Sequence, residues 1–179
     1  MVDTQPSLGP DTAELATTDN LTVDGVTINV SSLSEAVTSI VDAVEQGDNF
    51  SVCTLNLDHV VQLQQKPDFR AAYRRARFVT ADGFPIVVLS RLLGVPITRT
   101  AGADLVEPLC AAAGKKGLPI FLFGSDTATL ETCAAELTRR YEGLEVAGVL
   151  APGRNFSADS AEADDAIERI RTSLSLIHI

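Results

Sequence analysis

The chain has 179 residues, of which 45% are hydrophobic and 21% are charged, and its formal net charge is −10. This length suits one domain with a substantial core. The acidic balance argues against a nucleic-acid partner, because phosphate binding needs clustered lysine and arginine.

The three cysteines, Cys53, Cys110 and Cys133, are widely spaced and form no C-x-x-C pair. This pattern argues against a metal site and is typical of reduced, buried thiols in a cytosolic protein.

Both ends of the chain are expected to lie outside the folded domain. Residues 1–22 are polar and acidic without an apolar signal segment, which predicts a disordered leader. The last six residues, LSLIHI (174–179), match one reading frame of a sequencing-library transposon end and are interpreted as a non-native tail; a native apolar tail is the alternative. The predicted domain therefore covers residues 23–173. Its C-terminal part is expected to be missing, since no strand is predicted after the last helix.

Strand-type and helix-type patterns alternate along this domain. Helices are predicted at 33–46, 58–65, 68–76, 84–93, 103–116, 126–141 and 159–171, and strands at 26–30, 50–55, 77–81, 119–123 and 144–150. Alternation of this kind indicates βαβ units. The expected fold class is α/β, with a Rossmann-like, mostly parallel sheet flanked by helices in a single domain. The most apolar stretch, 85–97, is interrupted by Arg91 and is too short to span a bilayer.

Polar residues that follow the strands mark the candidate site, because open α/β sheets bind ligands beyond the carboxyl ends of their strands. Thr54 and Asn56 end one strand on the same side. Asp58 is interpreted as the following helix cap and His59 as a surface or packing residue. Asp82, in TADGFP, follows the next strand and is either a turn residue or a general base.

Two further positions qualify on the same reasoning. Gly124 and Ser125 separate a buried strand from a helix whose free N–H groups suit a phosphate, although a plain helix cap is the alternative. In RTAGADL, Arg99 suits a phosphate or is a solvated loop cation, and Asp104 lies close behind it. The arginines of residues 70–77 are interpreted as a solvated face or as a contact with an anionic membrane. The chain has no Walker, G-x-S-x-G, H-E-x-x-H or D-x-D motif, and the missing G-x-G-x-x-G disfavours a nicotinamide enzyme.

Taken together, the segments TLNLDHVVQLQQKPDFRAAYRRARFVTADGFPIVVLSRLLG, RTAGADL, IFLFGS and RRYEGLEVAG resemble the WecG/TagA/CpsF family of bacterial glycosyltransferases over about residues 23–156. The motifs T-x-N, A-D-G-x-P, G-x-D-L and F-L-x-G are specific as an ordered set. The resemblance implies transfer of an N-acetylmannosamine-type sugar from a UDP donor to a polyprenyl-diphosphate-linked acceptor. It implies inversion at the anomeric carbon, no metal or other cofactor, and a peripheral position at the inner face of the cell membrane.

The resemblance also implies roles for individual residues. Asp82 matches the proposed catalytic base, Thr54 and Asn56 line its pocket, and Asp104, Gly124 and Ser125 lie near the sugar nucleotide; Arg99 is a candidate for stabilising the leaving UDP. Family members continue with a further strand, a G-A-P-K-Q-E-like loop and a basic appendage, so this chain alone is expected to be inactive or very weak. A non-catalytic nucleotide-binding module is the alternative, and the VVLSRLL helix (87–93) is a candidate for self-association.

Overall fold

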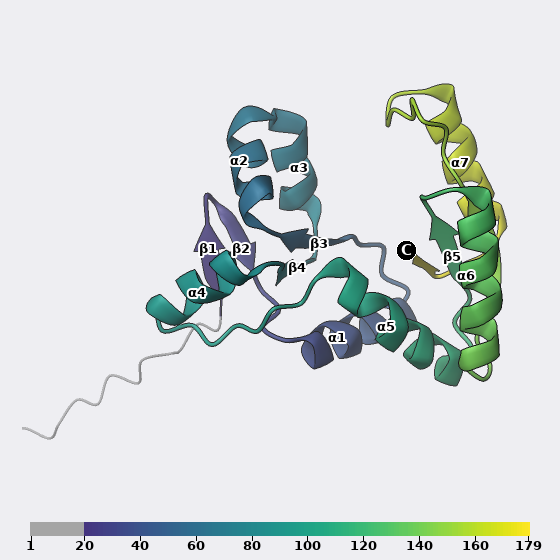
Figure 1. The fold of residues 1–179 in the computed structure, drawn as a ribbon, viewed down its shortest axis with the longest axis horizontal. Coiled ribbons are helices and arrows are strands. Elements are labelled where there is room, and N and C mark those ends of the chain that lie inside the picture. Colours follow the sequence, from purple (N-terminus) through teal and green to yellow (C-terminus); the bar gives the residue numbers. More distant parts are fainter. Residues whose placement is uncertain (1–19) are drawn as a thin grey trace, which may run out of the picture.

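The computed structural model describes residues 20–179 and confirms an α/β architecture. Helices and strands alternate through most of the chain (Figure 1). The helices are α1 (Leu33–Glu45), α2 (Leu57–Gln65), α3 (Pro67–Arg75), α4 (Phe84–Leu92), α5 (Gly102–Lys116), α6 (Thr127–Arg140) and α7 (Ala161–Thr172). The strands are β1 (Leu21–Val23), β2 (Val26–Ile28), β3 (Val52–Leu55), β4 (Phe78–Ala81), β5 (Ile120–Phe123), β6 (Val146–Leu150) and β7 (Ile177–His178).

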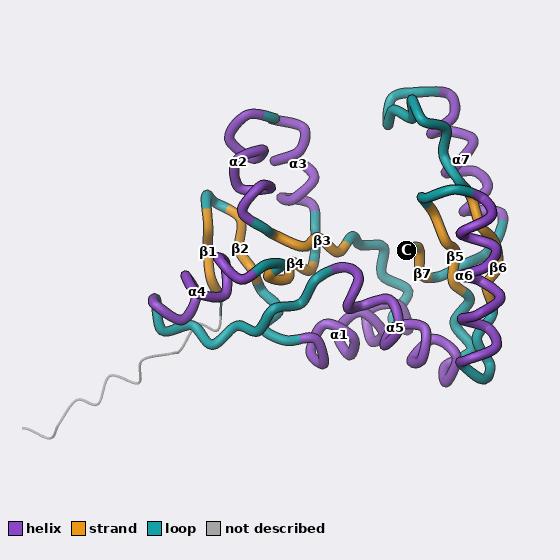
Figure 2. The backbone as a smooth tube through the Cα atoms, in the orientation of Figure 1, coloured by secondary structure: helices purple, strands orange, loops and turns teal. Residues whose placement is uncertain are grey.

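The predicted parallel pairing is present, but it is divided between two separate sheets. Strands β3 and β4 pair in parallel, with Thr54 opposite Thr80 and Leu55 opposite Ala81. Strands β6, β5 and β7 form the second parallel sheet, in that order. Figure 2 shows the two groups of strands apart from one another, with α1 and α5 between them. Within residues 20–179, β3 pairs only with β4, and β7 pairs only with β5.

An N-terminal hairpin was missed by the sequence analysis. Strands β1 and β2 are antiparallel and are joined by Asp24 and Gly25, whose φ angles are +47° and +76°. Two consecutive positive φ angles are the signature of a tight hairpin turn, for which Asp-Gly is a favoured sequence. The predicted leader therefore extends two residues too far, because Leu21 and Thr22 belong to β1. The rest of that predicted leader, up to residue 19, lies outside the described residues.

The expectation that no strand follows the last helix was also wrong. Strand β7 follows α7 and pairs in parallel with β5, with Ile177 opposite Ile120 and His178 opposite Phe121. Its residues lie in the hexapeptide interpreted as a non-native tail. Alternating apolar residues are sufficient for this pairing, because Ile177 turns inward and is buried while His178 remains exposed.

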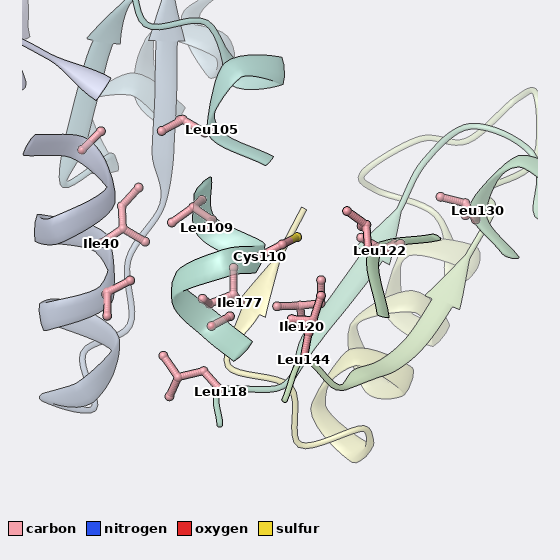
Figure 3. Packing of buried hydrophobic residues seen from close by; sticks show 14 of the residues in the cluster. Ile40, Leu105, Leu109, Cys110, Leu118, Ile120, Leu122, Leu130, Leu144 and Ile177 are labelled. Atoms are coloured by element: carbon pink, nitrogen blue, oxygen red, sulfur yellow. The ribbon is translucent and has the colours of Figure 1, made fainter. Parts of the chain in front are cut away.

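Two hydrophobic clusters hold the two sheets. One lies under β3 and β4 and includes Leu55, Leu63, Tyr73 and Ile86. The other joins α1 and α5 to the second sheet; Figure 3 shows its side chains, among them Ile40, Leu109, Cys110, Ile120 and Ile177. Helix α5 reaches both regions, because its first turn lies beside β3 and its later turns pack in the second cluster.

Candidate active site

The carboxyl ends of β3 and β4 bring three predicted site residues together. The N–H of Asp82 donates to the carbonyl of Leu55 at 2.8 Å, so the chain beyond β4 remains paired with the end of β3. A Cβ built on Gly83 would lie 3.9 Å from the Cβ of Asn56. Thr54, Asn56 and Asp82 therefore share one edge of this sheet, as the sequence predicts.

Asn56, and not Asp58, caps α2. The backbone of Asn56 is extended, and its Oδ1 accepts a hydrogen bond from the N–H of His59 at 2.8 Å. Asp58 lies in the first turn, where its Oδ2 accepts from Nε2 of Gln62 at 2.6 Å. Both residue types form good caps, and the extended backbone at residue 56 decides between them. Among the described residues, the side-chain NH₂ of Asn56 makes no hydrogen bond, so it remains available to a ligand.

Thr54 connects this edge with the start of α5. A Cβ on Gly102 would lie 3.7 Å from Cγ2 of Thr54, so the T-x-N and G-x-D-L motifs are in contact. The hydroxyl of Thr80, opposite Thr54, is buried and donates to the carbonyl of Thr100 at 2.7 Å. The N–H of Thr100 in turn donates to the carbonyl of Ala81 at 2.7 Å. These bonds fix the segment before α5 alongside β4.

His59 and Tyr73 hold the backbone at the end of β3. The Tyr73 hydroxyl donates to the carbonyl of Thr54 at 2.5 Å, and Nδ1 of His59 lies 2.9 Å from the same oxygen. Nδ1 also lies 2.8 Å from the Tyr73 hydroxyl, so it donates to the carbonyl in one tautomer of His59 and accepts from Tyr73 in the other. Burial raises the pKa of the Tyr73 phenol, and the charges of Cys53 and Asp82 raise it further. The predicted packing role of His59 is confirmed, and its ring also meets Phe69 edge to face.

The structural role of Tyr73 was not predicted. The only sequence signal was an apolar position on α3, and a hydroxyl partner 19 residues away is invisible to helical periodicity.

The Asp82 side chain differs from that of Asn56 in having no polar partner within residues 20–179. Among the described residues, its carboxylate has neither a hydrogen bond nor an ion pair, although the side chain is half-buried. It is therefore free to accept a proton from a ligand.

Arg99 and Asp104 form a pair at the start of α5. Nη1 of Arg99 lies 2.8 Å from Oδ2 of Asp104, and the same oxygen accepts from the N–H of Ala101 at 3.2 Å. Asp104 thus closes the first turn of the helix. Arg99 remains half-exposed, and its ion pair with Asp104 uses only the Nη1 group of the guanidinium. The other guanidinium N–H groups take no part in this ion pair.

Gly124 and Ser125 lie at the end of β5, in the other sheet. Gly124 donates its N–H to the carbonyl of Leu150 at 3.1 Å, and the two residues have φ angles of +128° and +50°. A Cβ on Gly124 would meet nothing within 4 Å, so the turn is open to close approach. Asp126 caps α6 by accepting from the N–H and hydroxyl of Thr129 at 3.0 and 2.6 Å. These bonds lower the pKa of the Asp126 carboxyl.

A cavity of about 440 Å³ lies between β3 and the C-terminal segment that contains β7, and α1 and α5 also line it. Thr54 and Gly102 form part of its wall, whereas Asn56, Asp82, Gly124 and Ser125 do not. The cavity therefore adjoins the β3–β4 edge through Thr54. The structure does not bring the turn after β5 into this cavity.

Within residues 20–179, no three histidine, cysteine, aspartate or glutamate side chains gather as a metal site would require. No helix in the same range has the length and apolar character needed to cross a membrane. The edge of the β3–β4 sheet instead offers an unpaired carboxylate, a free amide and an adjoining cavity.

One comparison with known proteins bears on this arrangement. The sequence model of the glycosyl transferase WecG/TagA/CpsF family matches residues 21–177. That range includes strands β1 to β6, the first residue of β7 and every predicted site residue. The chain therefore belongs to the WecG/TagA/CpsF family of glycosyl transferases.

Proposed function

We propose that the fold transfers an N-acetylmannosamine-type sugar from a UDP donor to a polyprenyl-diphosphate-linked sugar in the synthesis of a cell-surface polysaccharide or teichoic acid. The supporting observation is the Asp82 carboxylate, which is half-buried and unpaired among the described residues at the edge where β3 and β4 end. The proposed location is the inner face of the cell membrane, where such an acceptor is held by its lipid.

In this proposal Asp82 is the general base. An acceptor hydroxyl is a weak nucleophile until its proton is removed, so the carboxylate takes that proton as the oxygen attacks the anomeric carbon. The bond between that carbon and the UDP oxygen breaks as the new glycosidic bond forms, and the configuration inverts. The amide of Asn56 and the hydroxyl of Thr54 orient the two substrates.

The departing UDP gathers negative charge that needs stabilisation. Arg99 offers guanidinium N–H groups that its bond to Asp104 does not use. The open turn of Gly124 and Ser125, with the start of α6 behind it, offers backbone N–H groups. We propose that these groups bind the diphosphate.

The test replaces Asp82 with Asn, which keeps the shape of the side chain and removes the base. Transfer of radiolabelled sugar to a lipid-linked acceptor should fall by about 10²–10⁴-fold, while UDP binding measured by calorimetry should be unchanged. Asp58→Asn is the matched control and should retain turnover, because among the described residues the Asp58 side chain bonds only to Gln62.

Retained turnover in Asp82→Asn would reduce Asp82 to a turn residue. Binding of UDP by the wild-type chain without turnover would instead favour the non-catalytic nucleotide-binding module.

A further inference from the structure

The helix that follows Asp82 has an apolar outer face. Phe84, Leu92 and Leu93 are 71%, 79% and 61% exposed, and Leu89 is also exposed. Phe84, Val88 and Leu92 recur every fourth residue, so they form one stripe along α4. Figure 1 shows α4 at the outer edge of the molecule beside β1 and β2. An apolar stripe of this kind on a helix marks an interaction surface.

Folding does not require this stripe. The inner face of α4 consists of Ile86, Val87 and Ser90, all buried, and the Ser90 hydroxyl donates to the carbonyl of Val87 at 2.8 Å. The helix is therefore apolar on two opposite sides, although only one side reaches the core. A surface helix usually carries polar residues on its outer side.

The charges around α4 indicate which partner covers the stripe. Residues 83–103 contain Arg91 and Arg99 but no Asp or Glu, in a chain whose net charge is −10. Arg91 is exposed and forms no ion pair within residues 20–179. In the α3 region Arg70 and Arg77 pair with Asp24 and Asp48, whereas Arg74 and Arg75 are exposed and form no ion pair among the described residues, but no apolar stripe comparable to that of α4 accompanies them. An apolar stripe flanked by an unpaired cation suits an anionic lipid surface, whereas a two-fold contact between copies would bring like charges together.

The stripe is continuous with the candidate active site. Phe84 begins α4 two residues after Asp82, and exposed Leu57 begins α2 directly after Asn56. The closeness of Gly83 and Asn56 places the starts of the two helices side by side. Apolar side chains therefore border the carboxylate on the side where these helices begin.

We propose that the outer face of α4, comprising Phe84, Val88, Leu89, Arg91, Leu92 and Leu93, binds the surface of an anionic bilayer and thereby turns the Asp82 edge toward lipid-linked acceptors. This inference rests on the proposed function for its purpose, but vesicle binding tests it separately. Phe84 and Leu92 enter the acyl boundary, and Arg91 contacts the anionic headgroups.

The experiment measures flotation of the chain with vesicles of phosphatidylglycerol and with vesicles of phosphatidylcholine. The chain should float with the first and much less with the second. Leu92→Glu should weaken binding to phosphatidylglycerol by about tenfold or more, and Arg91→Gln by about fivefold. Ile167→Glu, at a 56% exposed position on α7, is the matched control and should leave binding unchanged. Circular dichroism confirms that each variant is folded.

Equal binding of the wild type and Leu92→Glu, or no binding of the wild type, overturns the inference. A dimer detected by light scattering that Leu92→Glu dissociates, without any flotation, assigns the stripe to a second copy of the chain and also overturns it. Transfer to a water-soluble acceptor without a lipid tail separates the two proposals, because that activity depends on Asp82 and not on the stripe.

Discussion

At the scale of single residues, Thr54 combines two separable roles. Its side chain contacts Gly102 and lines the cavity, whereas its backbone carbonyl accepts from the Tyr73 hydroxyl and lies 2.9 Å from Nδ1 of His59. A substitution of the side chain therefore leaves those hydrogen bonds in place.

Thr54→Ala should accordingly lower the rate of sugar transfer by about tenfold and change the free energy of unfolding by less than about 1 kcal/mol. Steady-state kinetics and urea denaturation measure the two effects on one preparation. A collapse of thermal stability would show that Thr54 is chiefly a packing residue.

Tyr73→Phe should have the opposite profile. The variant keeps the ring in the core but removes the hydroxyl that donates to the Thr54 carbonyl. Loss of this bond should lower the free energy of unfolding by about 1 kcal/mol. Urea denaturation of Tyr73→Phe, His59→Gln and the double variant measures the coupling between the two side chains, and strictly additive effects would contradict their direct contact.

The candidate site can be predicted from the sequence because its motifs directly follow strands. Thr54, Asn56 and Asp82 come together since neighbouring parallel strands end at the same edge. The identity of the cap at Asn56 was missed because Asn and Asp two residues apart are both good caps. Tyr73 was missed because its partner lies in a different element, which periodicity does not reveal.

At the scale of the elements, the helix starts follow local rules closely. Ser32 caps α1 by accepting from the N–H of Glu35 at 3.3 Å, and residues 32–35 read S-x-x-E, the sequence pattern of a capped helix start. Glu35 reaches back one residue further than a standard capping box, to the N–H of Ser31 at 2.8 Å. The hairpin around Asp24 and Gly25, by contrast, could not be predicted from local rules. Its two strands have three residues each, which is too short for a clear alternation of apolar and polar residues.

Asp126 should make the stability of α6 depend on pH. Its hydrogen bonds to Thr129 hold its carboxyl pKa below the usual value. The ionised carboxylate therefore stabilises the folded state more than the protonated acid does. The stabilisation is therefore complete above the ordinary aspartate pKa and is lost as pH falls through the lowered value. Asp126→Asn keeps an oxygen to cap the helix but cannot titrate. Urea denaturation from neutral to acid pH should show a smaller acid loss for this variant, and identical profiles would contradict the assignment.

At the scale of the whole molecule, the division into two parallel sheets was not predictable from the sequence. Strand patterns such as FSVCTL and PIFLF indicate burial and direction but do not specify which strands become neighbours. In the structure, β3 and β7 face each other across a cavity without pairing. The connection between the halves depends instead on helices α1 and α5.

Gly114 is essential to that connection. A Cβ at this position of α5 would lie 2.7 Å from the carbonyl oxygen of Glu142 and 3.1 Å from the nitrogen of Leu144, both backbone atoms. Gly114→Ala should therefore lower the free energy of unfolding by about 1–3 kcal/mol, even though alanine favours helices. Gly117→Ala is a control with open space around its Cβ and only the left-handed backbone as a penalty, about 1 kcal/mol. A stabilised Gly114→Ala protein would contradict this close approach.

The position of α5 has a mechanical consequence. Its 15 residues span about 22 Å; Gly102 at one end contacts Thr54, and Gly114 near the other end is locked against the turn before β6. Pro108 lies between these two contacts and has no backbone N–H to donate, so the helix has a bending point in its middle. The turn of Gly124 and Ser125 belongs to the β5–β6 half, and Asp82 belongs to the β3–β4 half. A displacement of one half would therefore be partly absorbed by bending at Pro108 before it reached the cavity beside the other.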